Sequence, residues 1–391
     1  MKKGYQRARN QAVARSRMSM TTTSSIQAAL LRYQSDILKA MHGALQRGSA
    51  NVLPTQATDL APFYGQMQYH LGWVDRDFAP VKNNLGKLLR PMLLLLAYEA
   101  AGAWGLCTDD KSHLGRALPA TASIELIHNF SLIHDDIVDG DAERRHRPTL
   151  WTVWGLSQGI NTGDGMFALA RLALWDSLPA GVDGEIAARL AAVLDRATLT
   201  IAEGQYLDLS FEQREDISVA MYLDMIGRKT AALMSAAAEM GGILGTRENA
   251  TIASLQAFGF EIGLAFQVRD DVLGVWASSA ELGKTSAGDI YRRKRSLPAL
   301  HALEHASTKD QQTLRRLYTQ ETPLTETQVA NVLAIFARAN TRDYCLAYLS
   351  QQCTRARQAL SNIPRLTNPS ATRALEDMQA LAHFIESTIQ D

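Results

Sequence analysis

Cysteine and proline are both scarce in this chain. Cys107, Cys345 and Cys353 are the three cysteines among 391 residues, and none belongs to a CxxC pair. Such a set indicates neither a disulfide framework nor a zinc site, and it favours a reducing cytoplasm. The 11 prolines and the hydrophobic content of 46% fit a helical protein that buries a large core.

An excess of charge of either sign is also missing. The 40 basic residues balance the 40 acidic ones, so charge gives no reason to expect nucleic acid or an anionic membrane as a partner. The sequence has no uninterrupted apolar run of the roughly eighteen residues that a membrane helix needs. We therefore expect no membrane span.

The first residues differ in composition from the rest. Residues 1–25 carry basic side chains and no acidic ones, and they lack the apolar stretch of a secretory signal. This composition predicts a disordered tail over 1–25, followed by a single domain over 26–391. Two alternatives stay open: a segment that docks to a partner or compartment, and an organelle transit peptide, since the segment is rich in arginine and contains serine.

A cluster of acids ends a long apolar segment in the first half of the chain. Residues 122–134 contain neither glycine nor proline and predict a buried helix. Asp135, Asp136 and Asp139 follow directly, and on a helix Asp135 and Asp139 share one face. Carboxylates this close are costly in an apolar setting without a cation. Mg²⁺ prefers such oxygen ligands and is often bound by carboxylates and substrate phosphates together. A single acidic cluster of this kind, however, is more often the solvated end of a helix.

The same arrangement recurs in the second half of the chain. The apolar run 258–268 ends in the adjacent acids Asp270 and Asp271. Two helices could therefore direct carboxylates into one cavity from opposite walls. This repetition favours a metal and diphosphate site over two unrelated surface clusters.

Basic residues complete the pattern. Lys87 and Arg90 stand three apart at the start of an apolar run, on one face if the segment is helical. Arg144 and Arg145 follow the first acidic cluster, and Lys284 and Lys294 follow the second. A guanidinium can grip phosphate oxygens in bidentate fashion, and an ammonium acts as a compact point charge. Alone, each pair would more often be ordinary surface charge.

These motifs together resemble those of the trans-isoprenyl diphosphate synthases, the polyprenyl synthetase family, and among them the bacterial short-chain geranylgeranyl and farnesyl diphosphate synthases. The resemblance runs in order from about Leu85 to Pro298. It covers GKLLRP (86–91), ELIHNFSLIHDDIVDGD (125–141), RRHRPT (144–149), GD (163–164), EGQYLDL (203–209), KT (229–230), FQVRDD (266–271), GK (283–284) and the segment 289–298.

The resemblance implies an enzyme that condenses isopentenyl diphosphate head-to-tail with an allylic diphosphate, using three Mg²⁺ ions in each active site with Mn²⁺ as an alternative ion. It also implies a homodimer. The diphosphate of isopentenyl diphosphate would be held by Lys87, Arg90, His128 and Arg145. The allylic diphosphate would contact Arg144, Lys229, Lys284 and Lys294, with metal on Asp135, Asp139 and Asp270. Thr230 and Gln267 would line the reacting centre, and Asp136 and Asp271 would be supporting members of the metal site.

One position departs from the family pattern. The second acidic motif commonly has a third aspartate where this chain has Gly274, a variant that resembles a bacterial subgroup. We expect this change to remove a supporting group without deleting the metal site.

Product length should depend on the residues one turn before Asp135. Phe130 and Ser131 stand there, and in the family a bulky residue at these positions limits chain growth. A single aromatic floor predicts a product of fifteen to twenty carbons, with geranylgeranyl diphosphate favoured over farnesyl diphosphate. The alternative is that Phe130 packs in the core and another residue sets the limit.

The expected fold is all-α, an isoprenoid-synthase-type bundle of about ten core helices around a deep central cavity. Long segments with helical period, such as 185–200 and 233–244, and little strict alternation support it. Two other functions stay open. A class I terpene cyclase would not need Lys87, Arg90 and His128, and a non-catalytic subunit of a heteromeric synthase would be expected to lose metal-binding or basic residues.

Overall fold

The computed structural model describes residues 2–50, 59–81, 86–103, 111–212, 214–277 and 287–387, with the side chains described from Ile26 onward and not at residues 111 and 112. Cys107 and Lys284 lie outside the described residues. The first half of the chain contains α1 (Lys2–Ala50), α2 (Ala61–His70), α3 (Leu89–Ala100), the 3₁₀ turn η2 (Lys111–Arg116), α4 (Leu118–Val138), α5 (Leu150–Trp154), α6 (Leu156–Trp175) and α7 (Gly184–Glu212).

The second half of the chain is also helical. It contains α8 (Val219–Ile226), the π-helical turn η3 (Gly227–Ala231), α9 (Ala232–Gly245), α10 (Asn249–Trp276), α12 (Gly288–Tyr291), α13 (Leu297–His305), α14 (Thr308–Thr319), α15 (Glu326–Arg338), α16 (Thr341–Ser361) and α17 (Pro369–Ser387). A hairpin of β1 (Glu143–Arg144) and β2 (Arg147–Pro148) is the sheet found among the described residues. The prediction of an all-α fold is confirmed.

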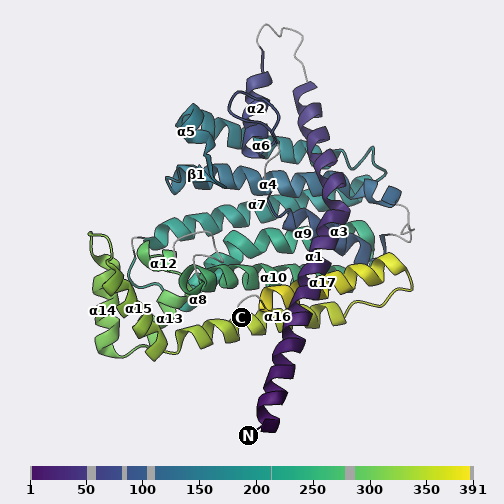
Figure 1. The fold of residues 1–391 in the computed structure, drawn as a ribbon. Coiled ribbons are helices and arrows are strands. Elements are labelled where there is room, and N and C mark those ends of the chain that lie inside the picture. Colours follow the sequence, from purple (N-terminus) through teal and green to yellow (C-terminus); the bar gives the residue numbers. More distant parts are fainter. Residues whose placement is uncertain are drawn as a thin grey trace.

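The long helices form a stack that is crossed by the N-terminal helix. In the view of Figure 1, α6, α4, α7, α9, α10 and α16 follow one another from top to bottom, and α1 runs across them. The pairs α4 and α6, α3 and α9, α9 and α10, and α10 and α16 pack together. Their buried apolar faces make up the main core, while α13 to α15 close over a smaller cluster around Val332, Ile335 and Phe336.

Buried polar contacts fix α1 to this stack. Tyr33 is fully buried, and its hydroxyl donates to Glu99 Oε2 at 2.5 Å. Arg32 forms an ion pair of 2.8 Å with Asp377 of α17. Helix α1 begins at Lys2. The disordered tail over 1–25 and the single domain over 26–391 stay predictions. The side chains before Ile26 lie outside the described residues, so the role of that segment stays a prediction.

One helix also meets the length and composition of a membrane span. In the part of the chain that the structure describes, this is α10, and 56% of its most apolar window is buried inside the protein. Core helices of globular proteins share these properties. The expected lack of a membrane span therefore rests on the sequence pattern together with this burial.

Candidate active site

The first acidic wall is the last turn of α4. Asp139 caps this helix and Asp135 lies four residues earlier, so both carboxylates stand on one face, as predicted. Burial raises the pKa of Asp135, with Lys229 opposing this shift and the charge of Asp139 adding to it. The two groups therefore share an acidic surface, half-buried at Asp135 and exposed at Asp139, that favours a bound cation.

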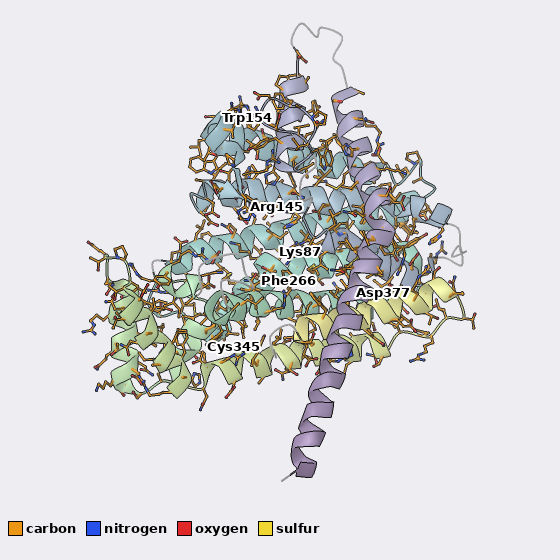
Figure 2. The ribbon with its side chains drawn as sticks, viewed as in Figure 1. Lys87, Arg145, Trp154, Phe266, Cys345 and Asp377 are labelled. Carbon is orange, nitrogen blue, oxygen red and sulfur yellow. The ribbon has the colours of Figure 1, made fainter. Side chains whose placement is uncertain are left out.

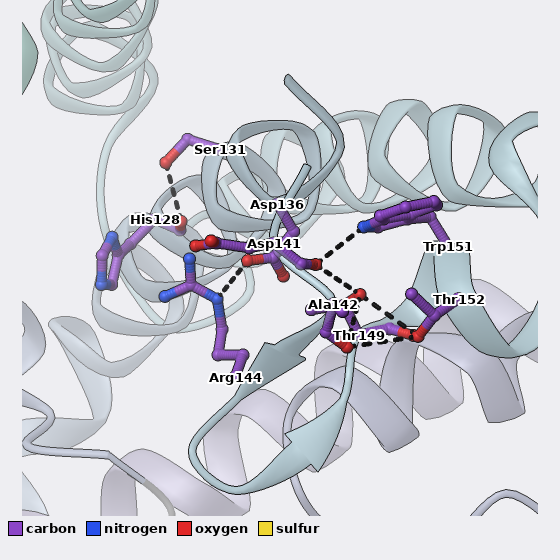
Figure 3. A network of polar contacts seen from close by, with 9 residues as sticks. All are labelled: His128, Ser131, Asp136, Asp141, Ala142, Arg144, Thr149, Trp151 and Thr152. Carbon is purple, nitrogen blue, oxygen red and sulfur yellow. Dashed lines mark hydrogen bonds and ion pairs between the residues drawn. The ribbon is translucent and has the colours of Figure 1, made fainter. Parts of the chain in front are cut away.

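Asp136 points to a different partner. It is 1% exposed, and its Oδ1 atom accepts a hydrogen bond of 2.7 Å from Arg144 Nε. Burial raises the pKa of Asp136 to about 6, although Arg144 opposes the shift. Figure 3 shows this ion pair beside the carbonyls of Asp141 and Ala142, which Trp151, Thr149 and Thr152 bind. Asp136 thus orients the Arg144 side chain next to the first acidic wall.

A tight hairpin carries the basic residues that follow. Arg145 and His146 occupy its two turn positions, and both have positive φ angles, 53° and 61°. This is the backbone of a type I′ turn, which usually takes asparagine or glycine. Arg147 anchors the hairpin by donating to Val74 O at 2.7 Å. The strained turn leaves the Arg145 side chain exposed, with its guanidinium beside Gly86 at the start of the GKLLRP motif.

A buried cluster connects this hairpin to the start of α3. Arg90 Nη1 lies 3.1 Å from His128 Nε2. Burial lowers the pKa of His128 well below its usual value, and Arg90 and Arg145 lower it further, so the ring is neutral and accepts from Arg90. Burial raises the pKa of Glu125 to about 7 against the opposing effect of Arg90. Three of the residues predicted to hold one diphosphate, Arg90, His128 and Arg145, therefore lie together, whereas the contacts of the fourth, Lys87, are with α10.

The second acidic wall lies on α10. Asp270 lines a cavity of about 780 Å³ together with Lys87, Gln267 and Lys294. Desolvation raises the pKa of Asp270, and Arg269, Lys87 and Lys294 oppose the shift. Lys87 also reaches α10 directly, since its Nζ atom lies 5.5 Å from the centre of the Phe266 ring. Figure 2 labels these two residues side by side in the middle of the bundle.

Asp271 is turned away from this cavity. It is 1% exposed, and its carboxylate accepts from Tyr222 Oη at 2.6 Å, from Gln267 Nε2 at 3.2 Å and from the Leu297 amide at 3.3 Å. Both of its oxygens are used by protein donors. Asp271 thus holds α8, α10 and α13 together and orients Gln267.

The π-helical turn η3 connects the two walls. Lys229 forms an ion pair of 2.6 Å with Asp208 of α7, and its charge also acts on Asp135 and Asp139. Burial lowers the pKa of Lys229, but these three carboxylates outweigh it and the pKa is raised. The next residue, Thr230, donates to Gln267 Oε1 at 3.0 Å. One turn therefore places an ammonium at the first wall and a hydroxyl at the second.

Gly204 of the EGQYLDL motif allows this turn to come close. A Cβ atom on Gly204 would lie 2.7 Å from the Cα atom of Lys229, a distance that real side chains essentially never show. Only glycine lets the backbone of η3 rest on α7 here. Turns of the π type are frequent at functional sites, and this one brings Lys229 within reach of three carboxylates.

The two residues predicted to limit product length lie on the same helix as the first wall. The Phe130 ring packs between α4 and α6, 5.3 Å from Phe167 and 5.8 Å from His134. Ser131 Oγ donates to the carbonyl of His128 at 2.8 Å and so lies against its own helix. Phe130 is half-buried, and it presents the larger apolar obstacle of the two.

Sequence reasoning missed several members of this site. Asp208 stood inside a recognised motif but received no role, because its partner Lys229 is 21 residues away. Glu125 is the first residue of the motif at 125–141 but received no role, and Tyr222 lies outside the motifs. Asp289 also lines the cavity beside Asp270, and its segment was recognised only as part of a longer match.

The carboxylates of the two acidic walls supply only some of the ligands that a Mg²⁺ ion needs. Among the residues that the structure describes, no group of three or more histidine, cysteine, aspartate or glutamate side chains converges as a complete metal site. Mg²⁺ typically takes one or two carboxylates and completes its shell with water and substrate phosphate. Asp135, Asp139 and Asp270 supply hard oxygen donors of this kind, so they fit an ion that a diphosphate completes.

Comparison with known proteins agrees with this geometry. The family model described as polyprenyl synthetase matches residues 73–336. The (2E,6E)-farnesyl diphosphate synthase of Mycobacterium tuberculosis is 36% identical over 321 residues, which cover 82% of this chain and 84% of the relative. The geranylgeranyl diphosphate synthase of the same organism is 36% identical over 299 residues, 76% of this chain and 80% of the relative.

A solved structure shows the same fold. The polyprenyl synthetase of Streptomyces coelicolor superimposes with a TM-score of 0.78 at 31% identity, covering 92% of this chain and 99% of that one. Both the matched family model and the aligned relatives span most of the elements that carry the two acidic walls. The chain therefore belongs to the polyprenyl synthetase family, and the prediction of a prenyltransferase is confirmed.

Proposed function

We propose that this protein is a short-chain trans-prenyl diphosphate synthase that condenses isopentenyl diphosphate head-to-tail with an allylic diphosphate. The observation that carries the proposal is the turn η3. Of its adjacent residues, Lys229 interacts electrostatically with Asp135 and Asp139 of the first acidic wall, and Thr230 donates to Gln267 beside the second. Two consecutive side chains could thus stabilise the leaving diphosphate and the carbon from which it departs.

The acidic residues would bind metal, and the basic residues would contact the diphosphate of the allylic substrate. Asp135, Asp139 and Asp270 would hold Mg²⁺, or Mn²⁺ in its place, and the family resemblance implies three ions in each active site. When bound, the metal supplies Lewis acidity that stabilises the departing diphosphate. Basic side chains would contact the same leaving group: Arg144, Lys229, Lys294 and Lys284, the last of which lies outside the described residues.

The reaction then needs a stabilised carbon and no water. As the allylic C–O bond breaks, its electron pair leaves with the diphosphate. The oxygens of Thr230 and Gln267, which are hydrogen-bonded to each other, would stabilise the carbon that becomes positive. The double bond of isopentenyl diphosphate attacks this carbon, and the product forms when a proton passes to the released diphosphate. Water would trap the cation as an alcohol, so the apolar helix walls have to exclude it.

The second substrate would be held by basic groups near the start of α3, with Lys87 reaching into the cavity that Asp270 lines. Lys87, Arg90, His128 and Arg145 form a cationic and neutral donor set in which His128 is uncharged. Such a set can bind a diphosphate through charge-assisted hydrogen bonds without an ion. A second basic set of this kind supports a synthase over a cyclase, which binds a single diphosphate.

Geranylgeranyl diphosphate is the product that we favour over farnesyl diphosphate. The Phe130 ring, which packs on Phe167 near the end of the helix that carries Asp135, supports a limit on product length at this position. The family includes relatives with either product, so the preference rests on this aromatic pair. Incubation with Mg²⁺, isopentenyl diphosphate and separate allylic primers, followed by chromatography of the products, tests both the reaction and the length. Cyclic hydrocarbon without consumption of isopentenyl diphosphate would favour a cyclase, and no turnover with any primer would favour a non-catalytic subunit.

We also infer a homodimer in the cytoplasm. Large apolar side chains stand exposed on α6 and α7, among them Leu172, Trp175, Leu199 and Tyr206. Exposed apolar groups gathered on neighbouring helices are typical of a surface that another protein covers. The unpaired thiols of Cys345 and Cys353 fit a reducing compartment. Light scattering of the purified protein and of Leu199→Glu would test the dimer, since the variant should reduce the measured mass if α7 lies in the interface.

A further inference from the structure

The space that a side chain at position 274 would fill is taken by another residue. A Cβ atom on Gly274 would lie 2.6 Å from the Cγ atom of Asp289 and closer still to its Oδ2 atom. Real Cβ atoms essentially never come within 3.0 Å of another heavy atom in this way. The two positions belong to different elements, α10 and α12, yet the carboxylate of one occupies the side-chain site of the other.

We propose that Asp289 supplies, from α12, the supporting carboxylate that the second acidic motif lacks at Gly274, and that glycine at 274 leaves the room in which this carboxylate lies. Asp289 is then a positioning residue for the cation held by Asp270. This inference rests on the proposed function, because it assumes that Asp270 faces a metal and a diphosphate. On this interpretation, Gly274 does not mark a missing carboxylate but leaves space for the carboxylate of Asp289.

The surroundings of Asp289 fit this role. The side chain is 6% exposed, and it lines the same cavity as Asp270, Lys87 and Lys294. Arg292 Nη2 donates to its Oδ1 atom at 2.9 Å, which leaves Oδ2 directed to the Gly274 side. Among the described residues, this arginine is its ion-pair partner, and the arginine is itself 68% exposed. A buried carboxylate with one exposed partner gains from a second positive charge in the cavity.

The backbone around α12 holds this carboxylate and one of the lysines together. Ala287, just before the helix, has a φ of 56°, in the left-handed region. The Lys294 amide donates to the Asp289 carbonyl at 2.9 Å. Because of these contacts, Asp289 and Lys294 form one compact loop that faces Asp270. A change in the position of Asp289 should therefore also disturb the cavity's cation binding, even where the fold survives.

The first experiment measures metal binding without catalysis. Mn²⁺ is titrated into the full chain with inorganic pyrophosphate, and bound ion is followed by electron paramagnetic resonance. Asp289→Asn should weaken Mn²⁺ binding about 10- to 100-fold, the usual effect of removing a supporting group from a metal site. Asp310→Asn is the control, since Asp310 pairs with Arg338 on the distant α14–α15 surface. Unchanged Mn²⁺ affinity in Asp289→Asn would overturn the inference.

The second experiment changes both residues that compete for the space beside Gly274. Gly274→Ala should weaken Mn²⁺ binding in the natural background, because its methyl group displaces Asp289, and should have little added effect in an Asp289→Ala background. Gly274→Asp combined with Asp289→Ala should recover at least tenfold of the affinity that Asp289→Ala loses. Additive effects of the single changes would contradict the proposal. Gly274→Ala, which keeps the Asp289 side chain, tests the proposal where Asp289→Asn fails to fold.

The two proposals fail in different ways. If the natural protein consumes isopentenyl diphosphate while the Asp289 and Gly274 variants bind Mn²⁺ normally, the inference is wrong and the synthase stands. If the natural protein binds neither Mn²⁺ with pyrophosphate nor isopentenyl diphosphate, the proposed function is wrong and the inference falls with it.

Discussion

Lys229 Nζ lies 2.6 Å from Asp208 Oδ2, and this ion pair fixes the ammonium between α7 and the end of α4. The same ammonium interacts with Asp135 and Asp139, which raise its pKa along with Asp208. Lys229 is thus a charged group held ready at the first acidic wall. Its neighbour Arg228 points elsewhere, to Asp224 and Glu203 on the exposed surface.

Removing the Lys229 ammonium should therefore slow the chemical step. We expect Lys229→Ala to lower kcat by about 100- to 1,000-fold, the range found when one fixed group that stabilises transition-state charge is lost. Steady-state kinetics with a fixed allylic primer would measure the change. Arg228→Ala is the matched control and should keep kcat within about twofold, since its partners are solvent-exposed. Equal losses in both variants would contradict a specific role for Lys229.

Tyr222 should contribute to stability through Asp271. Its buried hydroxyl donates to Asp271 Oδ2 at 2.6 Å. Tyr222→Phe leaves a buried carboxylate with one donor fewer, which should lower the free energy of unfolding by about 1–3 kcal/mol. Urea denaturation followed by circular dichroism would measure it. Tyr206→Phe, at a side chain that is 71% exposed, should change stability by less than about 0.5 kcal/mol.

Phe130 should set the depth of the product pocket. Phe130→Ala removes the ring that packs on Phe167, so we expect longer prenyl products by chromatography. Phe260→Ala serves as the control, because Phe260 lies on the outer side of α10 and is 38% exposed. An unchanged product distribution in Phe130→Ala would reject this residue as the floor.

Glu125 should make stability depend on pH in a defined direction. Burial raises its pKa from 4.5 to about 7 in the folded protein, so between these values the folded state binds more protons than the unfolded state. Stability from this group is therefore full below about pH 4.5 and is lost as the pH rises toward 7. The loss should be on the order of 2–3 kcal/mol.

Glu125→Gln tests this effect directly. The variant lacks the ionisable group, so its melting temperature should fall less than that of the natural protein between pH 5 and pH 7, measured without substrate. Glu326→Gln is a control, since it replaces an exposed acid in the first turn of α15. Parallel pH profiles for the natural protein and Glu125→Gln would show that Glu125 is not buried as described.

Much of the site was predictable because its groups are close in sequence. Helical spacing places Asp135 and Asp139 on one face, and the apolar runs before both acidic clusters indicate the buried helices that became α4 and α10. The order of the motifs identified the family, and the family model confirms it. These features depend on local periodicity and residue type, which a sequence displays directly.

The remaining features depend on contacts between distant segments. Asp208 meets Lys229, Tyr222 meets Asp271, and Asp289 enters the space beside Gly274 only after α7, α8, α10 and α12 have packed. The sequence alone determined an all-α prenyltransferase with two acidic walls, because helix periodicity and motif order are local properties. Tertiary structure alone decided which carboxylates face the cavity and which are buried against protein donors, because a charge's partners are set by packing.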